Sequence, residues 1–359
     1  MKSSFASSIV ASVLKRSASG AFVAVALIGT CFLFGCKAHE YYTSSADFDY
    51  FPTEKIYEFN VFKMLMDGRF AELDAMAESL RMSRKHVPNS TRWELLNFYT
   101  GLTYPDKYTE YGGWEGHIEK FREWVRANPN SITARIGLAE MILEYGWAFR
   151  GGDWAKNVSK ENWDLFNSKL NEAQQILNDA RALKVMCPEW YIAMQDVALG
   201  QGWDRDRYDT LFEQAISFEP DYLEYYENKA QYLLPIWNGT NGEWEQFAEE
   251  IQSRIGGKKG LAIYWDIFFS IGQRFYPEGK LFSDTDISWE KFLQGYSCRD
   301  EIYGVNARSL NRVCQLACYA GDKKTAKTFF EYISANKCVV RDVWKSRDNY
   351  LKAKEWALD

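Results

Sequence analysis

Apolar residues recur at intervals of three and four along the chain from residue 53 onward, and no segment of similar length alternates between apolar and polar residues. The first spacing gathers apolar side chains on one face of an α-helix, whereas alternation would indicate a half-buried β-strand. We therefore predict an all-α protein of antiparallel helix pairs, with turns such as the one at Gly68. The amphipathic segments cover residues 56–68, 69–82, 92–102, 117–127, 132–149, 162–183, 190–203, 207–218, 222–234 and 242–255.

A short internal repeat occurs at the ends of three of these segments, where two apolar residues spaced i, i+3 precede a proline by five residues. The last two of these prolines, Pro188 and Pro220, are 32 residues apart, close to the roughly 34-residue period of tetratricopeptide repeats. The repeats resemble that family but lack most of its consensus positions. We therefore expect an irregular α-solenoid that is tetratricopeptide-like. The three repeats are Phe121/Trp124/Pro129, Ala180/Leu183/Pro188 and Phe212/Ala215/Pro220.

Three glycines, Gly256, Gly257 and Gly260, mark the clearest break in the helical pattern. Glycine weakens helices and marks their ends, so we place a boundary near residue 257. It separates a helical-repeat domain, residues 53–257, from a C-terminal helical subdomain, residues 258–359.

The segment EYGWAFRGGDW, residues 144–154, interrupts one helical pattern with aromatic residues, an arginine and two glycines. Pro129 and Pro188 are 59 residues apart, so extra chain is inserted here relative to the later spacing of 32. We interpret the segment as a structural joint that also has a binding role.

Several segments, in order along residues 55–345, resemble a bacterial family, the domain-of-unknown-function family numbered 4034. The resemblance implies a helical-repeat scaffold. That family has no established activity, so the resemblance supplies no catalytic residue. The matching segments are DGRFAELD (67–74), RWELLNFYTGL (92–102), WAFRGGDWAKNV (147–158), EPDYLEYYENKAQYLLPIWNG (219–239) and GVNARSLNRVCQLACYAGD (304–322), with Trp344.

The N-terminus has the pattern of an export signal, because basic residues precede the apolar run 21–35. A helix of this length would span about 22 Å, less than the roughly 30 Å hydrocarbon core of a membrane. The run ends in Leu33-Phe34-Gly35-Cys36, which resembles the bacterial lipobox, whereas Thr30 before Cys31 fits that pattern less well. The resemblance implies that residues 1–35 are a signal peptide and that Cys36 is lipidated. An uncleaved membrane anchor is the alternative.

The residues after Cys36, up to residue 52, form a polar tether in this interpretation. Lys37 does not match the aspartate that retains lipoproteins in the inner membrane of enteric bacteria. We therefore expect an exported protein that is lipid-anchored to a bacterial membrane, with the outer membrane favoured.

The chain has a formal net charge of −6. The first 35 residues contain three basic and no acidic residues, which leaves 40 basic residues against all 49 acidic ones in the remainder. An acidic protein gains no affinity from the release of phosphate counterions, so we do not expect a nucleic-acid partner.

The sequence contains no recognisable catalytic constellation. Its three histidines are not at zinc-binding spacings, and neither G-x-S-x-G nor a P-loop motif occurs. We therefore predict no catalytic residue, metal or cofactor. Asp204 and Asp206 form an acidic pair, but an aspartate at a helix start is more often an N-cap.

Four cysteines lie in the C-terminal region, and no C-x-x-C spacing occurs among them. In an exported protein Cys298 could pair with Cys314 or Cys318 in a disulfide. The alternative is that these cysteines, with Cys338, are small buried packing residues.

The chain has 14 tryptophans, and a solenoid commonly presents a few aromatic residues and an arginine to a peptide partner. We predict a non-catalytic scaffold that binds a protein or peptide at the cell envelope. The rival hypothesis is an envelope enzyme or a binding module for cell-wall glycan, with a deep cleft that holds two facing carboxylates. The candidate partner-binding residues are Arg135, Trp147, Arg150, Trp154 and Trp190.

Overall fold

A computed structural model describes residues 53–103, 112–152, 155–183, 185–276 and 280–359. Over these ranges the regular structure is helical, and the pairing of His86 with Trp93 is an isolated β-bridge rather than a strand. The all-α prediction is confirmed. None of the described helices combines the length and the apolar character needed to cross a membrane. The predicted signal peptide, the tether and Cys36 lie outside the described residues.

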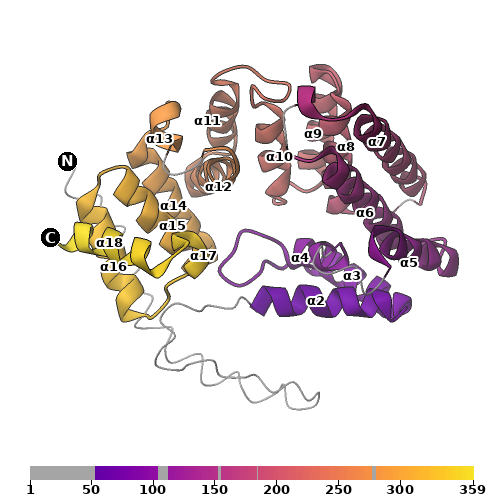
Figure 1. Ribbon diagram of the computed structural model, residues 1–359, viewed down its shortest axis with the longest axis horizontal. Coiled ribbons are helices and arrows are strands. Elements are labelled where there is room, and N and C mark those ends of the chain that lie inside the picture. The colour runs from indigo at the N-terminus through magenta and orange to yellow at the C-terminus, as the bar shows by residue number, and fades with distance from the viewer. Residues whose placement is uncertain (1–52, 104–111, 153–154, 184, 277–279) are drawn as a thin grey trace, which may run out of the picture. The chain divides into compact units, whose positions relative to one another are not determined.

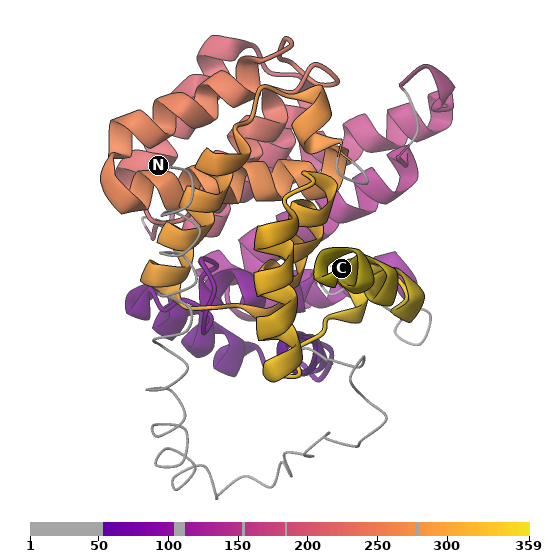
Figure 2. The same ribbon diagram turned by 90° about the vertical axis from the view of Figure 1, so that its left-hand side faces the viewer.

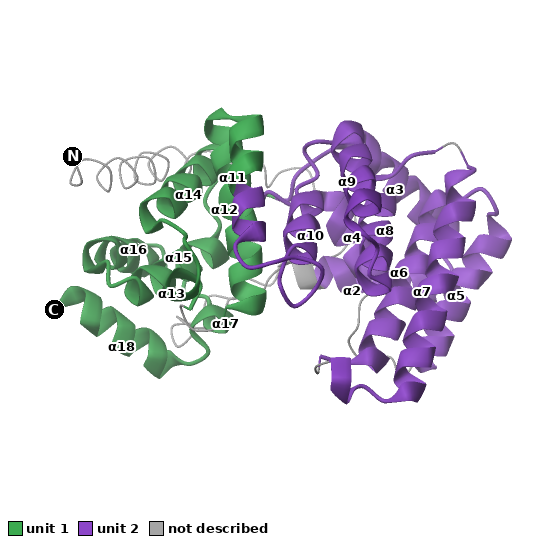
Figure 3. Cartoon of the chain, turned by 90° about the horizontal axis from the view of Figure 1, so that it is seen from above, with its two compact units in different colours: residues 1–51, 88–90, 249–359 green, residues 52–87, 91–248 purple. Residues whose placement is uncertain are grey.

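The chain divides into two compact units (Figure 3). Unit 2 comprises residues 52–87 and 91–248, and unit 1 includes residues 88–90 and 249–359. The division therefore falls within helix α11 (Glu243–Ile255). The glycines near residue 257 lie at the start of helix α12 (Gly257–Phe275), and the domain boundary placed there stays a prediction.

In unit 2, helices that follow one another in the chain mostly pack together (Figure 1). Helices α6 and α7 share the most extensive contact, and α8 packs against α7, α9 and α10. The helices are α2 (Thr53–Met66), α3 (Phe70–Ser83), α4 (Glu94–Leu102), α5 (Gly113–Ala127), α6 (Ile132–Arg150), the 3-10 helix η2 (Ala155–Asn157), α7 (Lys160–Arg181), α8 (Pro188–Gln201), α9 (Arg205–Phe218) and α10 (Glu224–Tyr232).

In unit 1, α12 packs against α14 and α15 packs against α16. Helix α16 also contacts the C-terminal helix α18, and Figure 2 shows α18, marked C, beside the helices that precede it. The helices that follow α12 in the chain are α13 (Leu281–Asp284), α14 (Trp289–Tyr303), α15 (Ala307–Tyr319), α16 (Lys323–Ala335), α17 (Arg341–Trp344) and α18 (Arg347–Leu358).

Side-chain caps explain where many of these helices begin. The Ser131 and Ser159 hydroxyls accept hydrogen bonds from the backbone N–H groups of Ala134 and Asn162. Each cap satisfies a donor that the first helical turn leaves unpaired. Asp204 caps α9 in the same way by accepting from the backbone N–H of Arg207 at 2.9 Å. This confirms the capping interpretation of Asp204.

Polar side chains that are buried or half-buried hold the turns between helices. In unit 2, Asp74 accepts hydrogen bonds from Trp124 (3.1 Å), Asn128 (2.7 Å) and Ser131 (2.5 Å), which ties α3 to the corner between α5 and α6. In unit 1, the buried Asn311 accepts from the Trp344 ring N–H at 2.8 Å. Asp74 and Asn311 both lie in segments that carry the family resemblance, and both have structural roles.

Candidate functional site

The predicted binding residues at the end of α6 form a joint between helices. The Trp147 ring packs edge-on against Phe166, with centroids 4.6 Å apart, and against Trp237 at 5.7 Å. The Arg150 guanidinium lies 5.6 Å from the centre of the Trp163 ring and donates to the Gly151 carbonyl at 2.9 Å. These contacts tie α6 to α7. Trp154, the fourth candidate, lies outside the described residues.

Gly151 ends α6 with a φ of 70°, a left-handed backbone conformation that glycine adopts without a steric penalty. Its N–H donates to the Trp147 carbonyl at 2.9 Å. Farther on, the Trp163 ring N–H donates to the Ala155 carbonyl at 3.2 Å. Gly151 at the end of α6 and the Trp163 ring on α7 therefore both contribute hydrogen bonds at the connection between these helices.

Arg135 lies at the opposite end of α6 from Trp147. Twelve residues of helix separate the two by about 18 Å. The Arg135 guanidinium donates to the Pro129 carbonyl at 2.7 Å, so it is engaged in the turn before α6. The structure therefore does not gather the predicted residues on one surface.

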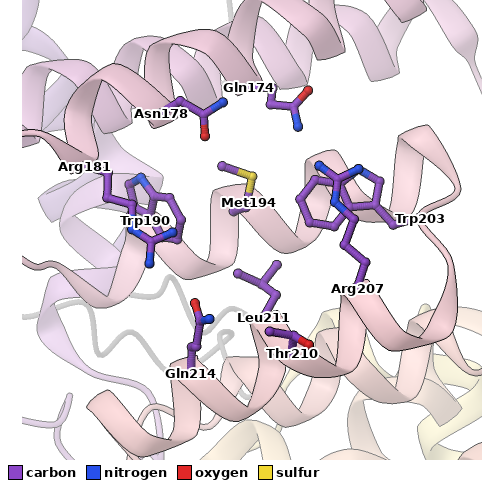
Figure 4. Close-up of a pocket in the computed structure, with 10 residues that line it drawn as sticks. All are labelled: Gln174, Asn178, Arg181, Trp190, Met194, Trp203, Arg207, Thr210, Leu211 and Gln214. Atoms are coloured by element: carbon purple, nitrogen blue, oxygen red, sulfur yellow. The ribbon is translucent and has the colours of Figure 1, made fainter.

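Trp190, the last candidate, lines a groove in unit 2 of about 330 Å³ between α7, α8 and α9 (Figure 4). Helix α8 contributes the floor because it packs against both of the other helices. No lining residue has an acidic side chain, a histidine ring or a thiol. The lining residues are Gln174, Asn178, Arg181, Trp190, Met194, Trp203, Arg207, Thr210, Leu211 and Gln214.

An arginine is stacked on a tryptophan at each end of this groove (Figure 4). The Arg181 guanidinium carbon lies 5.3 Å from the centre of the Trp190 ring. At the other end, Arg207 lies 3.2 Å from the centre of the Trp203 ring. Such stacking holds a guanidinium in place and leaves the N–H groups at its edge to donate hydrogen bonds.

The middle of the groove combines an apolar floor with polar walls. Met194 and Leu211 lie between the two arginine–tryptophan pairs and are both buried. Gln174 and Asn178 line the α7 side, and Gln214 lies across from them on α9. Each amide side chain offers both donors and acceptors, as a peptide backbone does.

Most of this groove is not evident from the sequence. Trp203 and Arg207 are only four residues apart, on either side of the Asp204 cap that begins α9, and this closeness in sequence could have indicated their contact. By contrast, Arg181 meets Trp190 only because the turn between α7 and α8 folds back. No spacing rule places α7 and α9 on either side of α8.

A buried pair of carboxyl groups lies elsewhere in unit 2. Glu189 on α8 is 1% exposed and accepts a hydrogen bond from the Tyr222 hydroxyl. Burial and the nearby Glu224 raise its pKa to about 8, against the lowering effects of Tyr222 and Arg92. Burial and repulsion by Glu189 also raise the pKa of Glu140 on α6. At neutral pH the Glu189 carboxyl group therefore holds a proton.

His117 is a core residue. It is fully buried, and its Nε2 lies 2.8 Å from the Leu102 carbonyl oxygen. Burial lowers the pKa of its imidazole to about 4, so the ring is neutral at physiological pH. Among the described residues, no group of three or more His, Cys, Asp and Glu side chains has a metal-binding arrangement.

The four C-terminal cysteines are free thiols in the structure. Cys314 is buried, whereas Cys298, Cys318 and Cys338 are partly buried. The Cys314 and Cys318 thiols are hydrogen-bonded to each other, and burial raises the pKa of Cys314. A disulfide among these residues stays a prediction.

No model of a known protein family matches this sequence, and no curated protein matches it either. The resemblance to the family numbered 4034 therefore stays a prediction.

Proposed function

We propose that this protein is a non-catalytic scaffold that binds an extended peptide segment of another protein in the groove between α7, α8 and α9. The lining of the groove supports this proposal: amide side chains on both walls and an apolar floor lie between two arginines, each over a tryptophan ring. Amide side chains can pair with the N–H and C=O groups of an extended backbone, and the floor can accept apolar side chains.

The setting of this activity is the cell envelope. We infer from the lipobox-like segment that a lipid on Cys36 attaches the protein to a bacterial membrane, with the outer membrane favoured. We further propose that the helix pairs of residues 53–257 form an irregular, tetratricopeptide-like α-solenoid. The succession of packed helices in unit 2 supports this arrangement.

A library of displayed random peptides, selected on the full chain in non-ionic detergent, tests the proposal. Thr210 is exposed on the groove wall, so Thr210→Trp should fill the groove without disturbing the core. We expect fluorescence polarisation to show at least about tenfold weaker binding of the selected peptides to this variant. Ser253→Trp, at an exposed position on α11, is the matched control and should bind normally. Equal binding by both variants would refute the assignment of the groove.

The buried carboxyl pair is the one observation that favours the rival hypothesis of a glycan-cleaving enzyme. Its geometry argues against that function. Glu189 is 1% exposed and its carboxyl group accepts a hydrogen bond from the Tyr222 hydroxyl in the core, whereas glycosidases hold their two carboxyl groups roughly 5 to 9.5 Å apart, with the sugar between them. Release of reducing ends from cell-wall polysaccharide by the wild type, and not by Glu189→Gln, would establish the rival function.

A further inference from the structure

We infer that the groove selects an acidic segment whose two carboxylates lie about six residues apart in an extended chain. This inference rests on the proposed peptide-binding function and adds the chemical class of the partner. Its basis is the placement of Arg181 and Arg207 at opposite ends of the groove, each stacked on a tryptophan.

The charge of the groove is opposite to that of the chain as a whole. The protein carries 49 acidic residues and a net charge of −6, yet the ten lining residues include two arginines and no carboxylate. Within the described part of the chain, neither guanidinium forms a salt bridge with an acidic side chain. Their N–H groups can therefore donate two parallel hydrogen bonds to one carboxylate, the bidentate geometry that arginine favours.

The spacing follows from the length of α8. Trp190 lies in the first turn of this helix, and Trp203 lies two residues beyond its last residue, Gln201. The helix rises by about 17 Å from Trp190 to Gln201, and the turn that follows brings the separation to about 20 Å. An extended peptide covers the same distance in about six residues. Residues i, i+2, i+4 and i+6 of such a peptide share a face. The first and last would therefore reach the arginines while the two between face Met194 and Leu211.

A peptide fits this lining better than an acidic polysaccharide does. Sugar rings bind proteins by stacking on exposed aromatic faces, but here each tryptophan ring carries an arginine on one face. In addition, Trp190 is only 3% exposed, and its ring N–H donates to the Leu177 carbonyl at 2.7 Å. The amide walls and apolar floor match a backbone with alternating apolar side chains.

The test uses a fluorescein-labelled peptide, Asp-Ser-Leu-Ser-Leu-Ser-Asp, and the full chain in detergent. We expect saturable binding that weakens at least about tenfold for Arg181→Gln and for Arg207→Gln, because each loses charge-assisted hydrogen bonds. Replacing both aspartates by asparagine should weaken binding to the wild type similarly. Arg126→Gln, which changes an exposed arginine on α5, should bind like the wild type.

Several outcomes would overturn this inference. Equal affinity for the aspartate and asparagine peptides, with binding still lost in Thr210→Trp, would leave peptide binding intact and remove the acidic specificity. Equal affinity for a peptide with its aspartates three residues apart would remove the spacing rule. Arginine-dependent binding of oligogalacturonate in place of the peptides would show that the partner is a polysaccharide. If the wild-type protein bound none of the peptides, the result would instead count against the proposed function.

Discussion

At the scale of single residues, Glu189 in the core of unit 2 makes the stability of the fold depend on pH. Its carboxyl group interacts with Tyr222, Glu224, Arg92, Asp196 and Glu140, and the first cause of its raised pKa is burial. A carboxyl group with an ordinary pKa of 4.5 in the unfolded chain and about 8 in the folded protein binds more protons when folded. Stability must therefore fall as pH rises between these two values.

Glu189→Gln should remove this dependence. The glutamine oxygen can still accept from Tyr222, and its side chain carries no charge at any pH. The free energy of unfolding of the wild type should fall by up to about 1.4 kcal/mol per pH unit between pH 4.5 and 8, relative to the variant. Urea unfolding at pH 5, 6, 7 and 8 measures the difference. Glu355→Gln, at an exposed site on α18, should keep the slope of the wild type. Parallel curves for wild type and Glu189→Gln would contradict the argument.

At the scale of elements, two helices that pack very closely require a small residue at the point of contact. Gly101 on α4 faces α2, where a Cβ added to it would lie 2.8 Å from the Val61 Cβ and 2.9 Å from the Glu58 carbonyl oxygen. Contacts of this kind cannot be relieved by turning a side chain, because one of the neighbours is backbone. The packing of α2 on α4 therefore depends on this glycine.

Gly101→Ala should lower the free energy of unfolding by about 1–3 kcal/mol, the usual cost of overpacking a core. This loss should appear although alanine is the better helix former. The matched control is Gly152→Ala, since an added Cβ there has no neighbour within 4 Å. Thermal and urea unfolding of both variants measure the difference. An unchanged or raised stability of Gly101→Ala would show that α2 can shift away from α4.

At the scale of the whole molecule, the sequence predicts helices better than it predicts the site. The expected helix over residues 132–149 matches α6 (Ile132–Arg150), because apolar spacing and a serine cap are both local signals. The short helices α13 and α17 were not predicted, since four residues are too few to show a period. The groove was missed apart from Trp190, because its arginines, amides and floor come from three helices that only the folded chain brings together.

The proposed membrane attachment concerns the whole chain, and the proposal assigns it to a lipid on Cys36. If Cys36 carries the diacylglycerol, Cys36→Ser should shift the protein from the membrane fraction to the soluble fraction, because two acyl chains anchor stably and none remains. Cys31→Ser is the matched control, since it alters the other cysteine of the apolar segment and should leave the protein in the membrane. Mass spectrometry of the extracted wild type should show a lipid-modified N-terminal cysteine with residues 1–35 removed. A peptide that joins an unmodified Cys36 to Gly35 would identify the segment as an uncleaved anchor.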